Sequence, residues 1–208
     1  MRLGVLGPAQ GDLPALAVRV QRLLDEQHAE KVIYLADDDA LEHIVASWAR
    51  GIVGDDDMDE HAVFERAATR CTMASSEAID EFVASERARL RLKVLVSLPE
   101  TRRLNELLGG RVALFVYDGD ALNEDDLAGA SLVVFGKSEE PVLKRVGARL
   151  HIAPGAIDSK TGGCALLDDG SGSIRIEIVS SSGEVTAREI MAAPSAAARM
   201  WAHGNSKL

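Results

Sequence analysis

Short apolar runs recur along the chain, and each of them ends in a turn rich in glycine or acidic residues. The four clearest runs lie at 2–6, 31–35, 111–116 and 131–135. Between the first two, apolar residues from Leu13 to Leu24 recur at the spacing of one helix face, and Asp12 is the predicted N-cap. The order of strand, helix and strand predicts a parallel pair of strands joined by a right-handed crossover.

The middle of the chain has a helical period instead. From residue 40 to about residue 92, apolar positions repeat every three or four residues in three segments. A further short helix is predicted within 98–110, where two glycines end it. We therefore expect a helical insertion at about 50–100. The predicted caps of the second and third segments are Asp57 or Asp59 and Ser75 or Ser76.

Strands return after the insertion. One is predicted within 148–156, and residues 163–191 contain three strands separated by two turns, which is typical of an antiparallel meander. Together with the early strands, this pattern predicts an α/β protein in which two mixed β-sheets pack as a sandwich flanked by helices, an αββα arrangement. We expect a single domain at 1–191 and a C-terminal tail at 192–208.

The acidic composition argues against a nucleic-acid partner. The 208 residues carry a net charge of −10, so a phosphate backbone is repelled on average. The most basic segment, 86–93, includes its own glutamate and is typical of the end of a solvated helix. No apolar run is long enough to cross a bilayer, so we expect no membrane partner either.

The cysteines and the N-terminus predict a reduced environment. Cys71 and Cys164 lie far apart in the sequence and match no zinc-binding spacing. The first twelve residues contain too few apolar side chains for a secretory signal. The sequence therefore predicts a cytoplasmic protein.

Four loops that follow strands carry the candidate chemistry. They read "GPAQGD" at 7–12, "ADDDA" at 36–40, "YDGDA" at 117–121 and "GKSEEP" at 136–141. The carboxyl ends of strands in an α/β sheet are the usual place for a site, so we expect these loops to gather at one edge. Their residues resemble the metal-binding motifs of calcineurin-like metallophosphoesterases, in particular the small bacterial phosphodiesterases and their relative in the retromer coat. The resemblance is weakest through the helical insertion.

The resemblance implies a dinuclear metal site, but the ligand types have changed. Where the family has Asp-x-His after its first strand, this chain has Pro8 and Gln10. The carboxylate that bridges the two metals in the family is kept as Asp37. The Gly-Asn-His-Asp turn that follows in the family has no counterpart here.

The later motifs are changed as well. Asp118 stands where the family has the histidine of His-Gly, and Lys137 and Glu139 stand where it has the two histidines of Gly-His-Thr-His. A metal site loses affinity as its ligands are removed, and an ammonium group repels a divalent cation. We therefore expect no metal and no other cofactor. Lys137 is predicted to fill the vacated volume and to pair with Asp37 or Asp118.

Ordinary structural roles compete with this interpretation. At least one of the three aspartates at 37–39 is predicted to cap the helix that begins near Ala40. Asp118 and Asp120 are also common turn formers, and the aspartates at 55–57 are predicted to lie in a solvated loop. An acidic cluster of Asp37, Asp38, Asp118 and Glu139 is the alternative to these separate roles.

Three functions fit the altered motifs. The first is a catalytically inactive member of the fold that acts as a protein-binding scaffold or regulatory module. The second is a phosphodiesterase or phosphatase with one Mg²⁺ or Mn²⁺ held by the oxygens of Asp37, Asp118 and Glu139. The third is a nucleotide or small-ligand sensor that uses the old pocket without chemistry, with Lys137 and the helix N-terminus after Asp12 as phosphate donors. The sequence names neither the partner nor the oligomeric state. The predicted protein interface lies on the insertion, at Phe64, Met73, Ile79, Phe82 and Val83.

Overall fold

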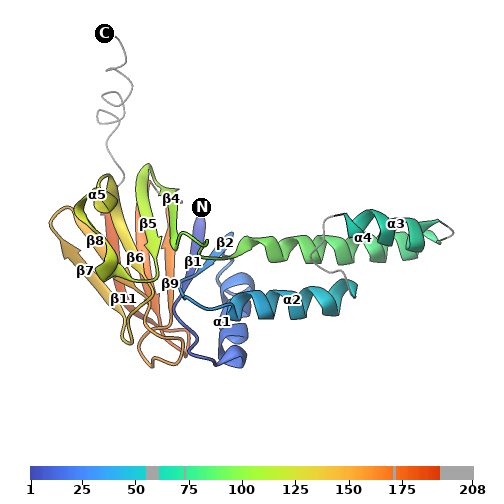
Figure 1. The fold of residues 1–208 in the computed structure, drawn as a ribbon, viewed down its shortest axis with the longest axis horizontal. Coiled ribbons are helices and arrows are strands. Elements are labelled where there is room, and N and C mark those ends of the chain that lie inside the picture. Colours follow the sequence, from blue (N-terminus) through green and yellow to red (C-terminus); the bar gives the residue numbers. More distant parts are fainter. Residues whose placement is uncertain (55–60, 73, 171, 193–208) are drawn as a thin grey trace, which may run out of the picture.

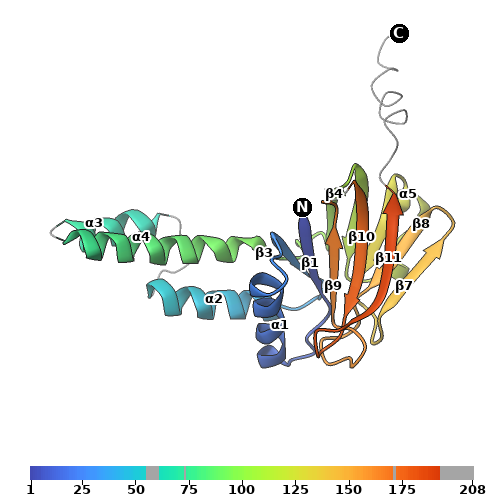
Figure 2. The same ribbon diagram turned by 180° about the vertical axis from the view of Figure 1, so that it is seen from behind.

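The computed structural model describes residues 1–54, 61–72, 74–170 and 172–192, and these form a β-sandwich with a helical arm on one side (Figures 1 and 2). The six-stranded sheet has the order β11 (Val185–Ala192), β10 (Ser173–Val179), β9 (Cys164–Asp168), β1 (Arg2–Leu6), β2 (Lys31–Tyr34) and β3 (Leu95–Ser97). The five-stranded sheet has the order β4 (Arg103–Leu108), β5 (Arg111–Val116), β6 (Ala130–Phe135), β8 (Arg149–Ala153) and β7 (Val142–Val146). Both sheets are mixed, and the predicted sandwich is confirmed.

The predicted parallel opening is confirmed in detail. β1 pairs in parallel with β2, which pairs in parallel with β3, and the meander β9, β10 and β11 is antiparallel. Apolar side chains that alternate along both sheets meet between them, because successive residues of a strand point to opposite faces. The largest fully buried members of this inner core include Leu3, Ile33, Phe115, Leu132, Leu150 and Ile152.

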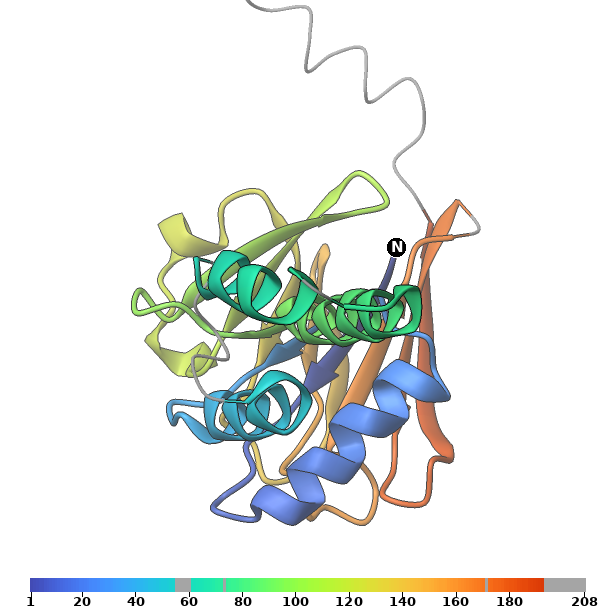
Figure 3. The ribbon, with the colours of Figure 1, turned by 90° about the vertical axis from the view of Figure 1, so that its right-hand side faces the viewer.

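The two outer faces are covered unequally. Helices α1 (Leu13–Asp25) and α2 (Ala40–Val53) pack on the six-stranded sheet (Figure 3). The outer face of the other sheet is covered only by the short η2 (Gly119–Ala121) and α5 (Glu124–Leu127) in the described residues. Asp12 caps α1 as predicted, since its Oδ1 accepts a hydrogen bond of 2.9 Å from the Ala15 amide.

The helical insertion is an arm that projects from the sandwich. It consists of the outer part of α2 with α3 (Ala62–Cys71) and α4 (Ser76–Arg91), and η1 (Leu92–Val94) leads from α4 into β3. Ser75 caps α4 as predicted, and Glu86 accepts hydrogen bonds of 2.8 Å from both Arg66 and Arg89. This buried carboxylate ties α3 to α4. No helix in the described part of the chain is long and apolar enough to cross a membrane.

Some predicted features on the arm and tail lie outside the described residues. These are the solvated loop at 55–57, the caps Asp57 and Asp59, the interface candidate Met73 and the tail from residue 193 onward. Ala192 is the last residue of β11.

The helix predicted within 98–110 is wrong, because Arg103–Leu108 is strand β4. Leu104, Leu107 and Leu108 have helical spacing, but β4 pairs antiparallel with β5 across a two-residue turn. The turn residues Gly109 and Gly110 have φ of 54° and 79°, as a type I′ hairpin requires. A pair of glycines between two apolar runs therefore specified a hairpin.

Strand β7, at the edge of the five-stranded sheet, was not predicted from the sequence. Lys144 and Arg145 interrupt its apolar pattern, and both are exposed. β7 pairs only with β8, and an edge strand tolerates charged side chains that a central strand would not. The weak apolar pattern therefore reflects the position of β7 in the sheet.

The two sheets touch through backbone at their carboxyl rim, the edge where β1, β2, β6 and β8 end. A Cβ atom at Gly136, after β6, would overlap the carbonyl oxygen of Leu35, after β2. A Cβ at Gly7, after β1, would overlap the carbonyl oxygen of Gly155, after β8. Each contact joins one sheet to the other, so the rim can close only where these positions lack a side chain.

Gly136→Ala tests this contact. The added methyl has no space beside the Leu35 carbonyl, so we expect a loss of unfolding free energy of about 1–3 kcal/mol. Gly51→Ala is the control, since Gly51 lies inside α2 and a methyl group added there would meet nothing within 4 Å. This change is expected to stabilise by about 0.5–1 kcal/mol. Urea unfolding of both variants measures the two effects, and equal midpoints for Gly136→Ala and the wild type would contradict the proposed overlap.

Candidate functional site

The four polar loops meet at the carboxyl rim, as predicted. The Pro8 carbonyl accepts a hydrogen bond of 3.0 Å from the Ile157 amide, and the Glu139 carbonyl accepts one of 3.0 Å from the Ala156 amide. The Lys137 amide donates to the Tyr117 carbonyl at 2.8 Å. The third and fourth loops are therefore joined directly, and the first and fourth are each bonded to residues 156–157, which follow β8.

A buried tyrosine joins the first two loops. The Tyr34 hydroxyl accepts a hydrogen bond of 3.0 Å from the Ala9 amide and donates one of 2.9 Å to Asp38 Oδ1. The same carboxylate oxygen accepts from the Ala40 amide at 3.1 Å and so caps the first turn of α2. Burial, together with the nearby carboxylate of Asp38, raises the pKa of Tyr34, which keeps the hydroxyl protonated as a donor. Asp39 occupies the N-cap position of α2 without a side-chain capping bond, and the predicted capping of this helix by an aspartate is made by Asp38, one residue earlier.

Asp37 faces a different partner. Its Oδ2 forms an ion pair with Arg102, which has a left-handed backbone with φ of 56°. Arg102 lies in the turn that leads into β4, so it reaches Asp37 across the rim. Asp37 and Asp118 both border a hollow of about 470 Å³ that Arg102, Arg103 and other residues also line.

Lys137 is paired with Asp118. Its Nζ donates to Asp118 Oδ2 at 2.6 Å, and Asp118 Oδ1 accepts from the Asp120 amide at 3.0 Å. The hydrogen bond from the Lys137 ammonium holds the pKa of the Asp118 carboxyl below its ordinary value. In turn, the hydrogen bond to Asp118 raises the pKa of Lys137. Both groups are therefore charged at neutral pH, and Asp118 also keeps its ordinary turn-forming role.

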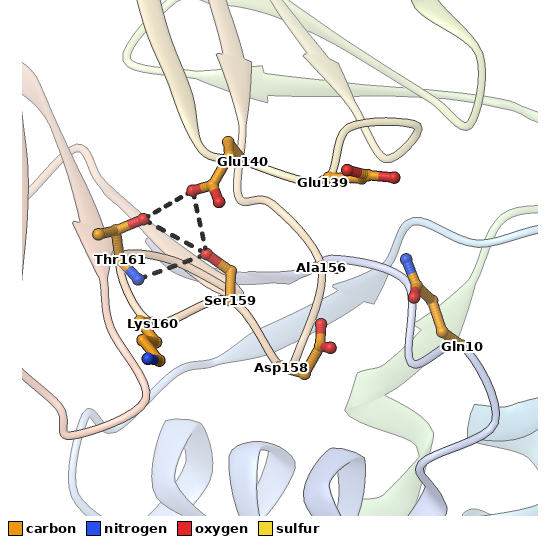
Figure 4. A pocket seen from close by; sticks show the side chains of 8 residues that line it. All are labelled: Gln10, Glu139, Glu140, Ala156, Asp158, Ser159, Lys160 and Thr161. Atoms are coloured by element: carbon orange, nitrogen blue, oxygen red, sulfur yellow. Dashed lines mark hydrogen bonds between the residues drawn. The ribbon is translucent and has the colours of Figure 1, made fainter.

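Gln10 and Glu139 lie on a second hollow of about 480 Å³ (Figure 4). On its other side, Glu140 accepts a hydrogen bond of 2.9 Å from the Thr161 hydroxyl, and Ser159 contacts both residues. In Figure 4, the side chains of Gln10 and Glu139 lie away from this hydrogen-bond network. Gln10 has φ of 52°, the left-handed region that a side chain seldom adopts.

The structure thus brings some of the candidate residues together and separates others. Asp37 and Asp118 share one hollow, whereas Glu139 borders the other with Gln10. Asp38 is engaged by Tyr34 and the start of α2. Pro8 contributes only its carbonyl, in a backbone hydrogen bond. The predicted cluster of four carboxylates is therefore divided among three local arrangements.

The residues at the rim do not fit the dinuclear metal site that the resemblance implies. Two carboxylates that could serve as ligands, Asp37 and Asp118, are each neutralised by a side-chain cation. Within the described residues, no three His, Cys, Asp or Glu side chains are grouped so that they could hold a metal ion. A divalent ion would have to displace both cations before it could use these oxygens.

Two residues of the rim were missed in the sequence. Tyr34 lies at the end of an apolar strand and looks like an ordinary core residue until its hydroxyl is placed. Arg102 was assigned to a helix, and only the β4–β5 hairpin reveals that it faces Asp37. The Gly109–Gly110 turn was the sequence signal for this hairpin, and the hairpin sets the position of Arg102.

Comparison with known proteins identifies the fold. No family model matches the chain, and no curated protein matches its sequence. Among solved structures, a conserved uncharacterised protein of Streptococcus pneumoniae TIGR4, described as a predicted phosphoesterase, has a TM-score of 0.51 at 11% identity, over 91% of this chain and 96% of that one. The phosphoesterase YfcE from E. coli has a TM-score of 0.49 at 16% identity, over 91% and 98%. Vps29 of Chaetomium thermophilum has 0.46 at 10% identity, over 93% and 98%. The likeness to the S. pneumoniae structure shows that the chain has a metallophosphoesterase-like fold.

Tyr34→Phe tests the link between the first two loops. The change leaves the Ala9 amide without its acceptor in a buried place, so we expect a loss of unfolding free energy of about 1–3 kcal/mol. Tyr117→Phe is the matched control, because no hydrogen bond of the Tyr117 hydroxyl is found within the described residues. Urea unfolding at pH 7 compares the two. If both variants lose the same small amount, the Tyr34 hydroxyl does not hold the loops together.

Proposed function

We propose that this chain is a catalytically inactive protein of the metallophosphoesterase fold that acts as a cytoplasmic, protein-binding scaffold or regulatory module. The observation that carries the proposal is the pair of ion pairs at the rim, Arg102 with Asp37 and Lys137 with Asp118. Each places a fixed positive charge against a carboxylate where the family resemblance implies a metal ligand. Hydrolysis by the family's chemistry depends on divalent ions that activate water and stabilise charge.

The two cations provide charge without that chemistry. A guanidinium or an ammonium group can neutralise a carboxylate and keep loops closed, but neither lowers the pKa of a bound water as a divalent ion does. Both pairs are partly exposed, so the loops depend as well on Tyr34 and on the backbone contacts of Gly136 and Gly7. In this proposal the rim is a structural replacement for the metal centre.

The alternative is a phosphodiesterase or phosphatase with one Mg²⁺ or Mn²⁺ held by Asp37, Asp118 and Glu139. The shared hollow of Asp37 and Asp118 supports it, while the placement of Glu139 on the second hollow does not. A single ion there would also have to displace Lys137 and Arg102. We therefore favour the inactive module, with no cofactor and with a protein partner.

Lys137→Met tests whether the lysine stabilises the rim. The folded pKa of Asp118 is lowered, so its contribution to stability is present above the unfolded pKa and is lost as pH falls through the folded value. The folded pKa of Lys137 is raised, so that contribution is lost only as pH rises through the folded value. We expect the variant to unfold at lower urea than the wild type near pH 7, and the difference to disappear in acid.

Lys160→Met is the control for this test, because Lys160 is an exposed lysine that borders the other hollow. Carboxyl-detected NMR adds a direct measurement. The acid midpoint of Asp118 is expected to rise in Lys137→Met and to stay unchanged in Lys160→Met. Unchanged stability and an unchanged midpoint in Lys137→Met would remove the proposed role of this lysine.

Metal titration tests the proposal as a whole. A ligand present at a hundred times its Kd stabilises a folded protein by about 2.7 kcal/mol, so specific Mn²⁺ binding would raise the melting temperature. We expect no saturable rise for the wild type with Mn²⁺ or Mg²⁺, and no turnover of bis(p-nitrophenyl) phosphate with either ion. A saturable rise with turnover, both abolished by Asp37→Asn and kept in Asp25→Asn, would establish the single-metal hydrolase instead.

A further inference from the structure

The outer face of the five-stranded sheet carries an apolar patch that the described residues leave exposed. Leu107 on β4 and Val112 on β5 lie directly opposite each other, and they are 65% and 36% exposed. Their neighbours Leu108 and Ala113 belong to the inner core, so both exposed side chains point away from it. On β6, Ala130 pairs with Val112 and is part of the small apolar cluster against which α5 packs. Leu107 and Val112, which we call the outer patch, therefore extend this cluster beyond the cover of α5.

Strand β11 ends close to the outer patch. Its last residue is Ala192, whose carbonyl oxygen accepts hydrogen bonds of 3.1 Å and 2.9 Å from Nε and Nη2 of Arg111. Arg111 directly precedes Val112 in β5. Figure 2 shows the end of β11 at the same end of the sandwich as α5 and the turn between β4 and β5. The segment that follows Ala192 therefore starts one arginine side chain away from the strand that carries Val112.

The segment after β11 has side chains that complement this surface. It contains no Asp or Glu, and Arg199, Met200 and Trp201 are consecutive in it. On α5, beside the apolar cluster, Glu124 and Asp125 are exposed and form no ion pair within the described residues. A basic residue followed by two large apolar residues therefore matches an apolar patch that lies beside two carboxylates.

We propose that Trp201 packs on the outer patch of its own chain, with Arg199 directed to the carboxylates of α5. Directly opposite residues of an antiparallel pair have Cβ atoms about 5 Å apart, a spacing that one indole ring covers. The contact removes apolar area of Leu107, Val112 and the indole from water, which favours it. The attraction between Arg199 and α5 fixes the direction in which the segment crosses the sheet.

The connection is long enough for this contact. Trp201 follows Ala192 by nine residues, and nine extended residues span about 30 Å. The two sheets of a sandwich pack about 10 Å apart, so the path from the end of β11 around the β4–β5 turn to the outer face is shorter than this span. The contact can therefore form within one chain, without a second copy.

The inference goes beyond the proposed function and is independent of it. Neither Leu107 nor Val112 borders either hollow of the rim. Metal binding and turnover test the rim, whereas the environment of Trp201 tests the outer patch, so one proposal can fail while the other holds.

Tryptophan fluorescence of the full chain tests the contact. The chain has two tryptophans, so Trp48→Phe leaves Trp201 as the only one. In this background we expect the emission of Trp201 to be protected from acrylamide, compared with the same protein unfolded in urea. Leu107→Lys places a charge on the outer patch and repels Arg199, so the quenching constant is expected to rise to the value of the unfolded chain. The protection is expected to be independent of protein concentration.

Two matched controls accompany this measurement. Val146 is 51% exposed on β7, at the opposite edge of the same sheet, and Val146→Lys is expected to leave the quenching constant unchanged. Arg199→Glu reverses the charge that faces α5 and is expected to raise the quenching constant. Lys207→Glu makes the same change of charge outside the proposed contact and is expected to have no effect.

Crosslinking gives a second measurement that keeps Trp201. In a Cys71→Ser background, Val112→Cys with Met200→Cys is expected to form a disulfide within one chain under mild oxidation, whereas Val146→Cys with Met200→Cys is expected to stay reduced. Trp201 as accessible to acrylamide in the folded chain as in urea would overturn the inference. Equal quenching in Leu107→Lys and Val146→Lys, or a disulfide that forms only between chains on a non-reducing gel, would overturn it as well.

Discussion

The rim of this protein depends on two places where the backbone of one sheet touches the backbone of the other. Gly136 lies against the Leu35 carbonyl, and Gly7 lies against the Gly155 carbonyl. Because each contact joins the two sheets, it fixes the distance between loops that follow strands far apart in the sequence. The contact between Gly136 and Leu35 therefore positions the two loops that follow these residues. These backbone contacts are therefore one interaction that holds the rim closed.

The cations at the rim follow from the same constraint. Once the loops are fixed, Arg102 lies within reach of Asp37 and Lys137 lies within reach of Asp118, so each carboxylate has a cation as its partner. Exposed ion pairs contribute little to stability by themselves. In the proposed function, these ion pairs exclude metal instead: a divalent ion that enters the hollow would meet carboxylates that are already neutralised. The buried hydroxyl of Tyr34 makes the stronger structural contribution, because its partners are removed from water.

The spacing of apolar residues and the residues at turns were enough to predict the sandwich, the parallel β1–β2 pair and the meander. They also predicted the capping by Asp12 and Ser75. Each of these features is marked by residues within one element or at its ends. The site was predictable in position but only partly in its pairing. Lys137 lies beside Asp118 because its amide is bonded to the Tyr117 carbonyl. Arg102 reaches Asp37 because it precedes the β4–β5 hairpin, which was misassigned as a helix. Long-range backbone pairing therefore decides which charges meet.

The rim and the arm are stabilised by different means, which allows one to change without the other. The rim depends on contacts between sheets, whereas the arm depends on its own helix packing, on the buried Glu86 carboxylate between two arginines, and on Leu92 where α4 enters the sandwich. A buried carboxylate with two arginine partners fixes how α3 lies on α4. Because the two regions share none of these stabilising residues, a substitution in the arm is expected to leave the rim unchanged.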